Sequence, residues 1–381
     1  MHRRAAALAV PLTALTLAVS SCGSIPEEWR TPAFLRMGEE QLDPRIPDVT
    51  GEVGEEPEIT FPDVGLPDEE ISGVVATGSG EDELVRADDL LVANVVQYQW
   101  TAPGEGELVE GQSSYETGAP DLIRMNQMPE YITDSLVNQS VGSRVVYVFP
   151  PLSEEEAAQA EAAGQETPEG ASVLVLDVME RFGNGSLVPG EQTTDGGDGL
   201  PTVTQDEVSA PVIEIPDTDP PEELTVEHLI EGTGPEVEEG QQVVVQYTGI
   251  RWEAEEDGTH EPFDSTWSRA GEPFDATLAE GSLIEGWVEG MVGERVGSRL
   301  LLVIPGDLAY GETAEEAGGG PAGTLVFVVD LLGAYDNPPP AEEIEDEGSA
   351  EGEEGSEEEA SPEEEASPGD EPSEEPSDGE E

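Results

Sequence analysis

The sequence has 381 residues, enough for two domains and their linkers, and carries 88 acidic residues against 13 basic ones, a formal net charge of −75. Every basic residue is an arginine. Because contacts to a phosphate backbone need basic patches, this composition argues against nucleic-acid binding, and the acidity by itself names no partner.

Residues 1–21 have the pattern of an export signal. Met1-His2-Arg3-Arg4 is basic, and Ala5–Val19 is apolar but short for a membrane span. Val19-Ser20-Ser21-Cys22 resembles the lipoprotein box of bacteria, and Cys22 is the only cysteine, so it has no internal disulfide partner. We expect cleavage before Cys22 and a lipoprotein anchored to the outer face of the cytoplasmic membrane. The alternative is an ordinary signal peptide with an incidental cysteine.

An internal repeat follows the signal. Residues 22–68 are rich in Pro, Glu and Gly without periodicity, which is typical of a spacer. Residues 69–183 then share three tetrapeptides, in the same order, with residues further on: Val95–Tyr98 recurs as Val244–Tyr247, Val141–Arg144 as Val296–Arg299, and Val175–Val178 as Val328–Leu331. A short helix pattern also recurs, at Pro129, Ile132, Thr133 and Leu136. The repeat predicts two copies of one fold.

The second copy lies in residues 222–336, after a linker at 184–221 that is rich in Gly, Asp, Thr and Pro. Strand patterns occur at Val243–Trp252, Leu300–Ile304 and Thr324–Leu332. Between them Ile284, Trp287, Val288 and Met291 form one face of a short helix, which Gly293 can end. This arrangement predicts an α+β domain with an antiparallel sheet packed on one helix.

The motifs of this second copy resemble the FKBP-type peptidyl-prolyl isomerases over residues 222–335. They are VVVQYTG at 243–249, PFDST at 262–266, LIEGWVEGM at 283–291 and IPGDLAYGE at 304–312. The resemblance implies two FKBP-like domains, the first of them degenerate, each an antiparallel β-sheet wrapped on one short α-helix. It also implies a shallow apolar pocket for a proline ring, lined by Tyr247, Phe263, Phe274, Leu283, Ile284, Trp287 and Phe327. Without the resemblance, these aromatic side chains would read simply as core.

The implied chemistry needs no cofactor. Rotation about an X-Pro bond has a barrier of roughly 18–20 kcal/mol because it breaks amide resonance. A dry pocket with one or two hydrogen-bond donors can stabilise the twisted amide. We expect Tyr310 to donate its hydroxyl to the substrate carbonyl and Asp264 to orient neighbouring donors, although Asp264 could also be a turn residue. The scattered histidines and the single cysteine predict no metal site.

Two departures from the family pattern affect function. The loop at 312–323 has three consecutive glycines and none of the bulky aliphatic residues that the family usually carries there, so turnover and macrolide affinity depend on it. In the first copy, Ile132 is found at the position of Trp287, and Leu174 at that of Phe327. The position of Tyr310 corresponds to about Glu155. Of the pocket residues only Tyr98, matched to Tyr247, remains. We therefore expect the first copy to lack isomerase activity.

Residues 337–381 are almost entirely Glu, Ser, Pro, Gly and Ala, which predicts a disordered acidic tail. The leading hypothesis is a peptidyl-prolyl isomerase whose clients are proline-containing unfolded or nascent exported polypeptides, with a macrolide of the rapamycin type as a candidate inhibitor. The alternative is a non-catalytic chaperone-like or partner-binding module that reuses the fold.

Overall fold

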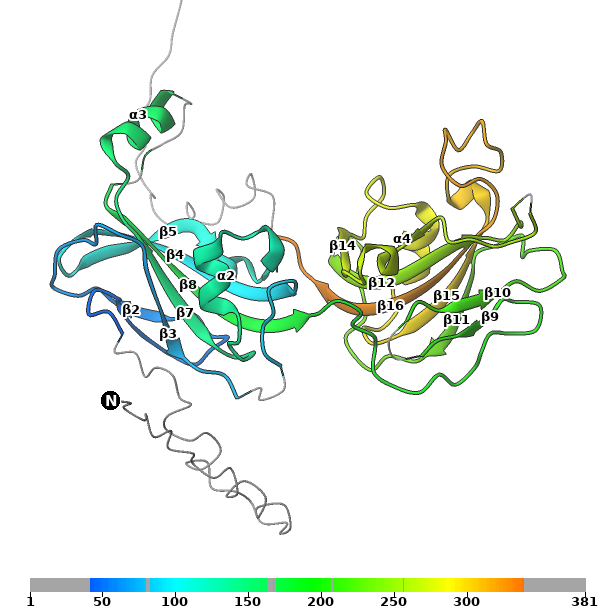
Figure 1. The fold of residues 1–381 in the computed structure, drawn as a ribbon, viewed down its shortest axis with the longest axis horizontal. Coiled ribbons are helices and arrows are strands. Elements are labelled where there is room, and N and C mark those ends of the chain that lie inside the picture. The colour runs from blue at the N-terminus through cyan, green and yellow to red at the C-terminus, as the bar shows by residue number, and fades with distance from the viewer. Residues whose placement is uncertain are drawn as a thin grey trace, which may run out of the picture. The chain divides into compact units, whose positions relative to one another are not determined.

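A computed structural model describes residues 42–338, apart from 80–82, 163–166, 168, 207–208 and 256. The signal, Cys22, half of the spacer and nearly all of the acidic tail lie outside the described residues. Within the described part, no helix is both long and apolar enough to cross a bilayer. Figure 1 shows two sheet-plus-helix bodies, one for each copy of the repeat.

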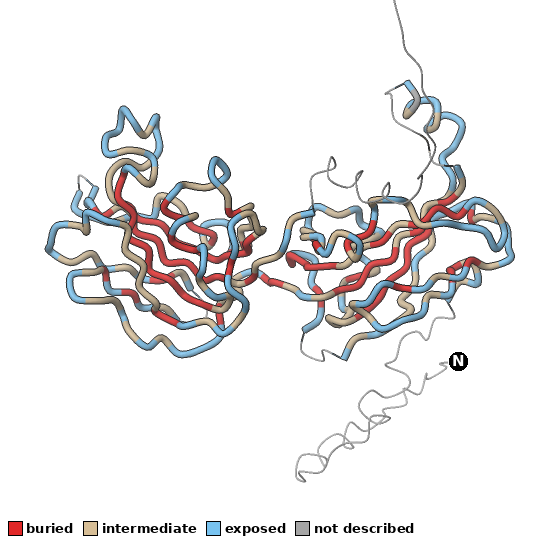
Figure 2. Tube along the Cα trace, turned by 180° about the vertical axis from the view of Figure 1, so that it is seen from behind, coloured by how far each residue is buried: buried red, intermediate tan, exposed pale blue. Residues whose placement is uncertain are grey.

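The sheet of the second body has six antiparallel strands. Five follow the order β11-β15-β16-β12-β13, and β14 also pairs with β12. The strands are β11 (Thr225–Ile230), β12 (Gln242–Arg251), β13 (Asp264–Ser265), β14 (Phe274–Thr277), β15 (Arg299–Ile304) and β16 (Leu325–Tyr335). These bounds confirm the strands expected from the apolar runs. Figure 2 shows the buried residues concentrated along the sheet strands.

The sheet of the first body has the same topology. Its order is β3-β7-β8-β4-β5, and β6 also pairs with β4. The strands are β3 (Ile71–Ala76), β4 (Leu90–Ala102), β5 (Glu105–Ser113), β6 (Asp121–Arg124), β7 (Arg144–Phe149) and β8 (Ala171–Phe182). The expected fold class, two bodies that each pack an antiparallel sheet on one short helix, is confirmed.

One helix packs on each sheet. In the second body α4 (Glu285–Met291) buries Trp287 and Met291, and Gly293 follows its end with a positive φ of 87°. In the first body α2 (Glu130–Leu136) begins after Pro129 and buries Leu136. The other described helical segments are the helix α3 (Glu154–Ala162) and four short turns: α1 (Ser114–Thr117), η2 (Met125–Gln127), η3 (Thr266–Arg269) and η4 (Gly306–Leu308).

A small hairpin precedes each sheet and covers the face away from the helix. The hairpin of β1 (Asp48–Thr50) and β2 (Glu58–Thr60) lies against the first body, where Phe61 packs with Trp100. The hairpin of β9 (Thr202–Thr204) and β10 (Val212–Glu214) lies against the second body, where Val203 packs with Trp252 (Figure 1). The spacer predicted at 22–68 and the linker predicted at 184–221 thus each contain a hairpin, because their few apolar side chains cover a sheet.

The strand register corrects one part of the predicted repeat. Asp177 lies opposite Asn94 in the first sheet, and Asp330 lies opposite Gln246 in the second. Asn94 thus corresponds to Gln246, and the residue that corresponds to Tyr247 is Val95. Tyr98 lies three positions further along the strand, and an odd shift reverses the face of the sheet. It packs instead with Phe61 under the N-terminal hairpin, so it is not a remnant of the pocket.

Candidate active site

The aromatic side chains of the second body surround a pocket of about 790 Å³ on the helix side of the sheet. Tyr247 comes from β12, Phe274 from β14, Trp287 from α4 and Phe327 from β16. All nine residues predicted for the site line this pocket: Tyr247, Phe263, Asp264, Phe274, Leu283, Ile284, Trp287, Tyr310 and Phe327. The topology brings them together because β12, β14 and β16 are neighbours and α4 crosses their face.

The rings contact one another edge to face. Trp287 lies perpendicular to Tyr247 and to Phe327, with centroid distances of 5.1 and 5.3 Å, and Phe263 meets Phe327 at 5.5 Å and 90°. Such contacts stabilise a cluster beyond its buried area and fix the orientation of each ring. Trp287 is only 4 % exposed, and its Nε1 has no hydrogen-bond partner among the described residues. The rings therefore act as core and leave an apolar concave surface.

Asp264 belongs to a polar network at one side of the pocket. Its carboxylate accepts hydrogen bonds from the Tyr247 hydroxyl and, at 2.5 Å, from Nη1 of Arg269, whose Nη2 donates to the Tyr247 oxygen at 3.1 Å. Burial alone would raise the pKa of Asp264, but these two hydrogen bonds outweigh it and hold the pKa below its usual value. Burial and the neighbouring carboxylate raise the pKa of Tyr247 to about 12. Asp264 is therefore a fixed anion at neutral pH.

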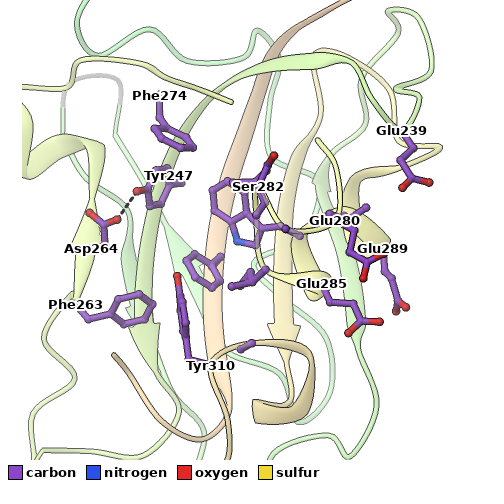
Figure 3. A pocket seen from close by; sticks show the side chains of 17 residues that line it. Glu239, Tyr247, Phe263, Asp264, Phe274, Glu280, Ser282, Glu285, Glu289 and Tyr310 are labelled. Atoms are coloured by element: carbon purple, nitrogen blue, oxygen red, sulfur yellow. Dashed lines mark hydrogen bonds between the residues drawn. The ribbon is translucent and has the colours of Figure 1, made fainter. Parts of the chain in front are cut away.

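Tyr310 stands beside Phe263 and directs its hydroxyl into the pocket (Figure 3). The residue is 45 % exposed, and its hydroxyl makes no hydrogen bond within the described part of the chain. Burial, with a smaller contribution from the negative charge of Asp264, raises the pKa of Tyr310. The phenol is thus protonated at neutral pH and free to donate to a bound ligand.

The glycine-rich loop after Tyr310 gives the pocket no wall. None of the lining residues comes from 312–323, although every residue of that loop is described. The loop instead closes on itself, since Gly323 N–H donates to the carbonyl of Gly311 at 3.0 Å. Gly320 lies behind the Tyr310 ring, where an added Cβ would be 3.6 Å from Tyr310 Cγ. The departure noted in the sequence therefore leaves this side of the pocket without aliphatic cover.

The side of the pocket opposite Asp264 is acidic. Figure 3 shows Asp264, Phe263 and Tyr310 on one side and a group of glutamates on the other: Glu239, Glu280, Glu285 and Glu289. None of these four side chains has an ion-pair or hydrogen-bond partner among the described residues. The opening thus combines an apolar floor with free negative charge on its rim.

Comparison with known proteins agrees with this geometry. Residues 234–332 match the sequence model of the family described as FKBP-type peptidyl-prolyl cis-trans isomerase. The FK506-binding protein of Streptomyces anulatus is 40% identical over 128 residues, which are 33% of this chain and 97% of that protein. This chain belongs to the FKBP-type peptidyl-prolyl cis-trans isomerase family.

Other FKBP relatives align with a similar part of the chain. The probable FK506-binding protein of Corynebacterium glutamicum is 41% identical over 126 residues, covering 32% of this chain and 98% of that protein. Among solved structures, FkpA from Escherichia coli is 36% identical, with 31% of this chain and 49% of that one covered and a TM-score of 0.26.

Sequence reasoning missed Arg269, which joins Asp264 to Tyr247 in the FKBP pocket. The helical turn η3 lies between the two residues and brings Arg269 back within reach of Asp264, with which it forms an ion pair. The available signal was an arginine five residues after Asp264 in a chain with few cations.

The first body has filled the equivalent space with other side chains. Val95 and Leu174 stand at the register positions of Tyr247 and Phe327, and Ile132 takes the place of Trp287 on the helix. Tyr147 and Phe149 on β7 replace Leu302 and Ile304 of β15. Their rings stack at 6.3 Å, and the Tyr147 hydroxyl hydrogen-bonds Ser135 of α2 at 2.5 Å. Larger strand residues thus occupy the volume that the pocket rings enclose in the second body.

Proposed function

We propose that the second body catalyses cis-trans isomerisation of X-Pro bonds in exported polypeptides. The observation that carries this proposal is the pocket with an apolar floor at Trp287, a phenol at Tyr310 that is available to donate, and an anion at Asp264. A planar amide is more polar than a twisted one, so removing water from its carbonyl favours the twisted state. A proline ring against Trp287 would place that carbonyl near the Tyr310 hydroxyl.

Each polar side chain has a distinct role in this proposal. Tyr310 donates a hydrogen bond to the carbonyl oxygen of the substrate. Asp264 does not react, but fixes the Tyr247 hydroxyl through the bonds that it shares with Arg269. Shortening the time constant of isomerisation from tens of seconds to milliseconds requires a barrier lower by about 5–6 kcal/mol. Desolvation and one or two hydrogen bonds can supply that amount.

A protease-coupled assay on proline tetrapeptides tests the function. It should use the chain without the expected signal, residues 1–21. A fragment that begins at residue 222 is unsuitable, because it lacks the β9–β10 hairpin that packs on the sheet of the second body. We expect activity in the parent chain, a loss of about two- to tenfold in kcat/KM for Tyr310→Phe, and a larger loss for Trp287→Ala. Asp264→Ala should also lower kcat/KM. Full activity in all three variants would contradict the site assignment.

The second body is proposed to act alone, because the first body has replaced its pocket residues. Trp287→Ala combined with Tyr310→Phe should therefore leave no activity above that of the uncatalysed reaction. Activity retained in that double variant would place a second site elsewhere in the chain.

The proposed location is the outer face of the cytoplasmic membrane, through lipid on Cys22. This rests on the lipoprotein-like sequence around Cys22, which lies outside the described residues. Expressed with its signal, the chain should enter the detergent phase, whereas Cys22→Ala should stay in the aqueous phase. Equal partitioning of the two chains would contradict lipid anchoring.

A non-catalytic binding module remains the second candidate, since the loop at 312–323 gives the pocket no aliphatic cover. Such a module would bind a rapamycin-type macrolide or a proline peptide without accelerating isomerisation. Binding measured by calorimetry, together with absence of turnover in the same preparation, would favour it.

A further inference from the structure

The segment from Thr266 to Thr277, which follows β13 and ends with β14, carries one wall of the pocket. It holds Arg269, the ion-pair partner of Asp264, and the aromatic side chain of Phe274. Phe274 meets Tyr247 at 5.8 Å and Trp287 at 6.4 Å, in both cases edge to face. A shift of this segment would move an aromatic wall and the partner of Asp264 together.

An arginine of the first body holds this segment on both sides of Phe274. Arg124, the last residue of β6, donates from Nη1 to Glu272 at 2.7 Å. Its Nη2 donates to the carbonyl of Pro273 at 3.1 Å and forms an ion pair with Asp275. The side chain is 22 % exposed, and a guanidinium is suited to such a fork of several acceptors.

Further contacts join the two bodies near Arg124. Gly185 N–H donates to the carbonyl of Gly271 at 2.7 Å, and Asn126 reaches Glu272 at 3.4 Å. A small apolar cluster lies between the sheets, in which Leu90, Val92 and Phe182 of the first body pack with Val244 of the second. Both bodies belong to the same compact unit of the described chain. The cluster brings β6 next to the pocket wall and thereby makes the arginine contact possible.

The second copy has no arginine at the position that corresponds to Arg124. Arg124 lies opposite Leu90, and the residue at the same register position in the second body is Thr277, opposite Gln242. The repeat therefore accounts for strand β6 but not for the positive charge of Arg124 at its end. Among the nine arginines that the structure describes, Arg124 is the one whose carboxylate partners lie in the other body, and these partners flank the pocket residue Phe274.

We propose that Arg124 is a positioning residue for the pocket of the second body. The first body, which lacks the pocket residues, serves the site by holding the segment from Thr266 to Thr277 through this arginine. The inference rests on the proposed isomerase function for its effect on rate, and on contacts alone for its effect on the segment. A partly exposed ion pair contributes little to global stability, whereas displacement of a binding wall changes rates steeply.

The test compares Arg124→Gln with Arg45→Gln in the chain without residues 1–21. Arg45 is the matched control, because its carboxylate partners Asp43, Asp68 and Glu69 all lie in the first body. We expect Arg124→Gln to lower kcat/KM about three- to tenfold, mainly through KM, and to speed amide hydrogen exchange at 266–277. Arg124→Lys keeps the charge but not the forked guanidinium, so its kcat/KM and its exchange rate should lie between those of the parent and of Arg124→Gln. Arg45→Gln should match the parent in both measurements.

Asp275→Asn removes the same ion pair from the other side, so the double variant with Arg124→Gln should lose less than the sum of the two single effects. Unchanged exchange at 266–277 in Arg124→Gln overturns the proposal, as does faster exchange with unchanged kcat/KM in an active chain. If the parent chain has no isomerase activity, the proposed function fails, and the exchange comparison still decides whether Arg124 holds the segment.

Discussion

Single side chains in this pocket serve packing and chemistry at once. Trp287 belongs to the buried core of the second body and also forms the pocket floor, so its removal affects stability as well as binding. Asp264 and Tyr310 differ in this respect, because both lie at the edge of the ring cluster. Their contributions can be measured with small effects on folding, which makes them the better probes of mechanism.

The lowered pKa of Asp264 gives an acid-limb prediction. A carboxyl whose pKa is lower in the folded than in the unfolded state adds stability above its unfolded value of about 3.9, and that stability is lost as the pH falls through the folded pKa. Asp264→Asn should therefore be less stable than the parent at pH 7 and lose less stability on acidification. Urea unfolding from pH 7 to about pH 2 measures both.

Glu285→Gln is the control for this experiment, because it removes one negative charge from the pocket rim without breaking a hydrogen bond among the described residues. Its acid limb should follow the parent. An acid limb for Asp264→Asn as steep as that of the parent would contradict the assigned role of Arg269 and Tyr247.

At the level of elements, the hairpin of β9 and β10 belongs to the second body in packing, although it precedes that body in sequence. Val203 is fully buried against Trp252 and the strands β15 and β16. The same arrangement recurs in the first body, with Phe61 packed on Trp100. The repeating unit is therefore a hairpin followed by a sheet and helix, and a fragment that begins at residue 222 lacks one layer.

Two valines of this hairpin provide a matched pair. Val203→Ala should destabilise the second body by about 1–3 kcal/mol, since it removes buried methyl groups and leaves a cavity. Val212→Ala should change stability by less than about 0.5 kcal/mol, because Val212 is 58 % exposed. Thermal and urea unfolding measure both values, and an equal effect of the two changes would contradict the packing role of the hairpin.

For the whole molecule, charge is the dominant property. The net charge of −75 and the four unpaired glutamates at the pocket surround the site with negative potential. Salt at physiological strength screens such a potential over about 8 Å, so its effect on approaching substrates depends on ionic strength.

Proline peptides with a basic residue beside the proline should therefore be preferred over acidic ones. At low salt we expect kcat/KM for an arginine peptide to exceed that for the matching glutamate peptide by about two- to tenfold, and the ratio to shrink in 0.5 M salt. Glu285→Gln together with Glu289→Gln should reduce the low-salt ratio. A ratio that does not respond to salt would show that charge plays no part in substrate choice.

The sequence alone predicted three strands of the second body, one short helix in each copy and the nine pocket residues, because alternation and helical spacing are local properties and the motifs of the second copy resemble a known family. Tertiary structure decided the rest. The face occupied by Tyr98 depends on strand register, and a shift of three residues reverses it. Arg269 meets Asp264 only through the helical turn η3, and Arg124 reaches Glu272 only because the two bodies pack together. These contacts join residues whose separation in the chain carries no periodic signal, so they exist only once the sheets have formed and paired.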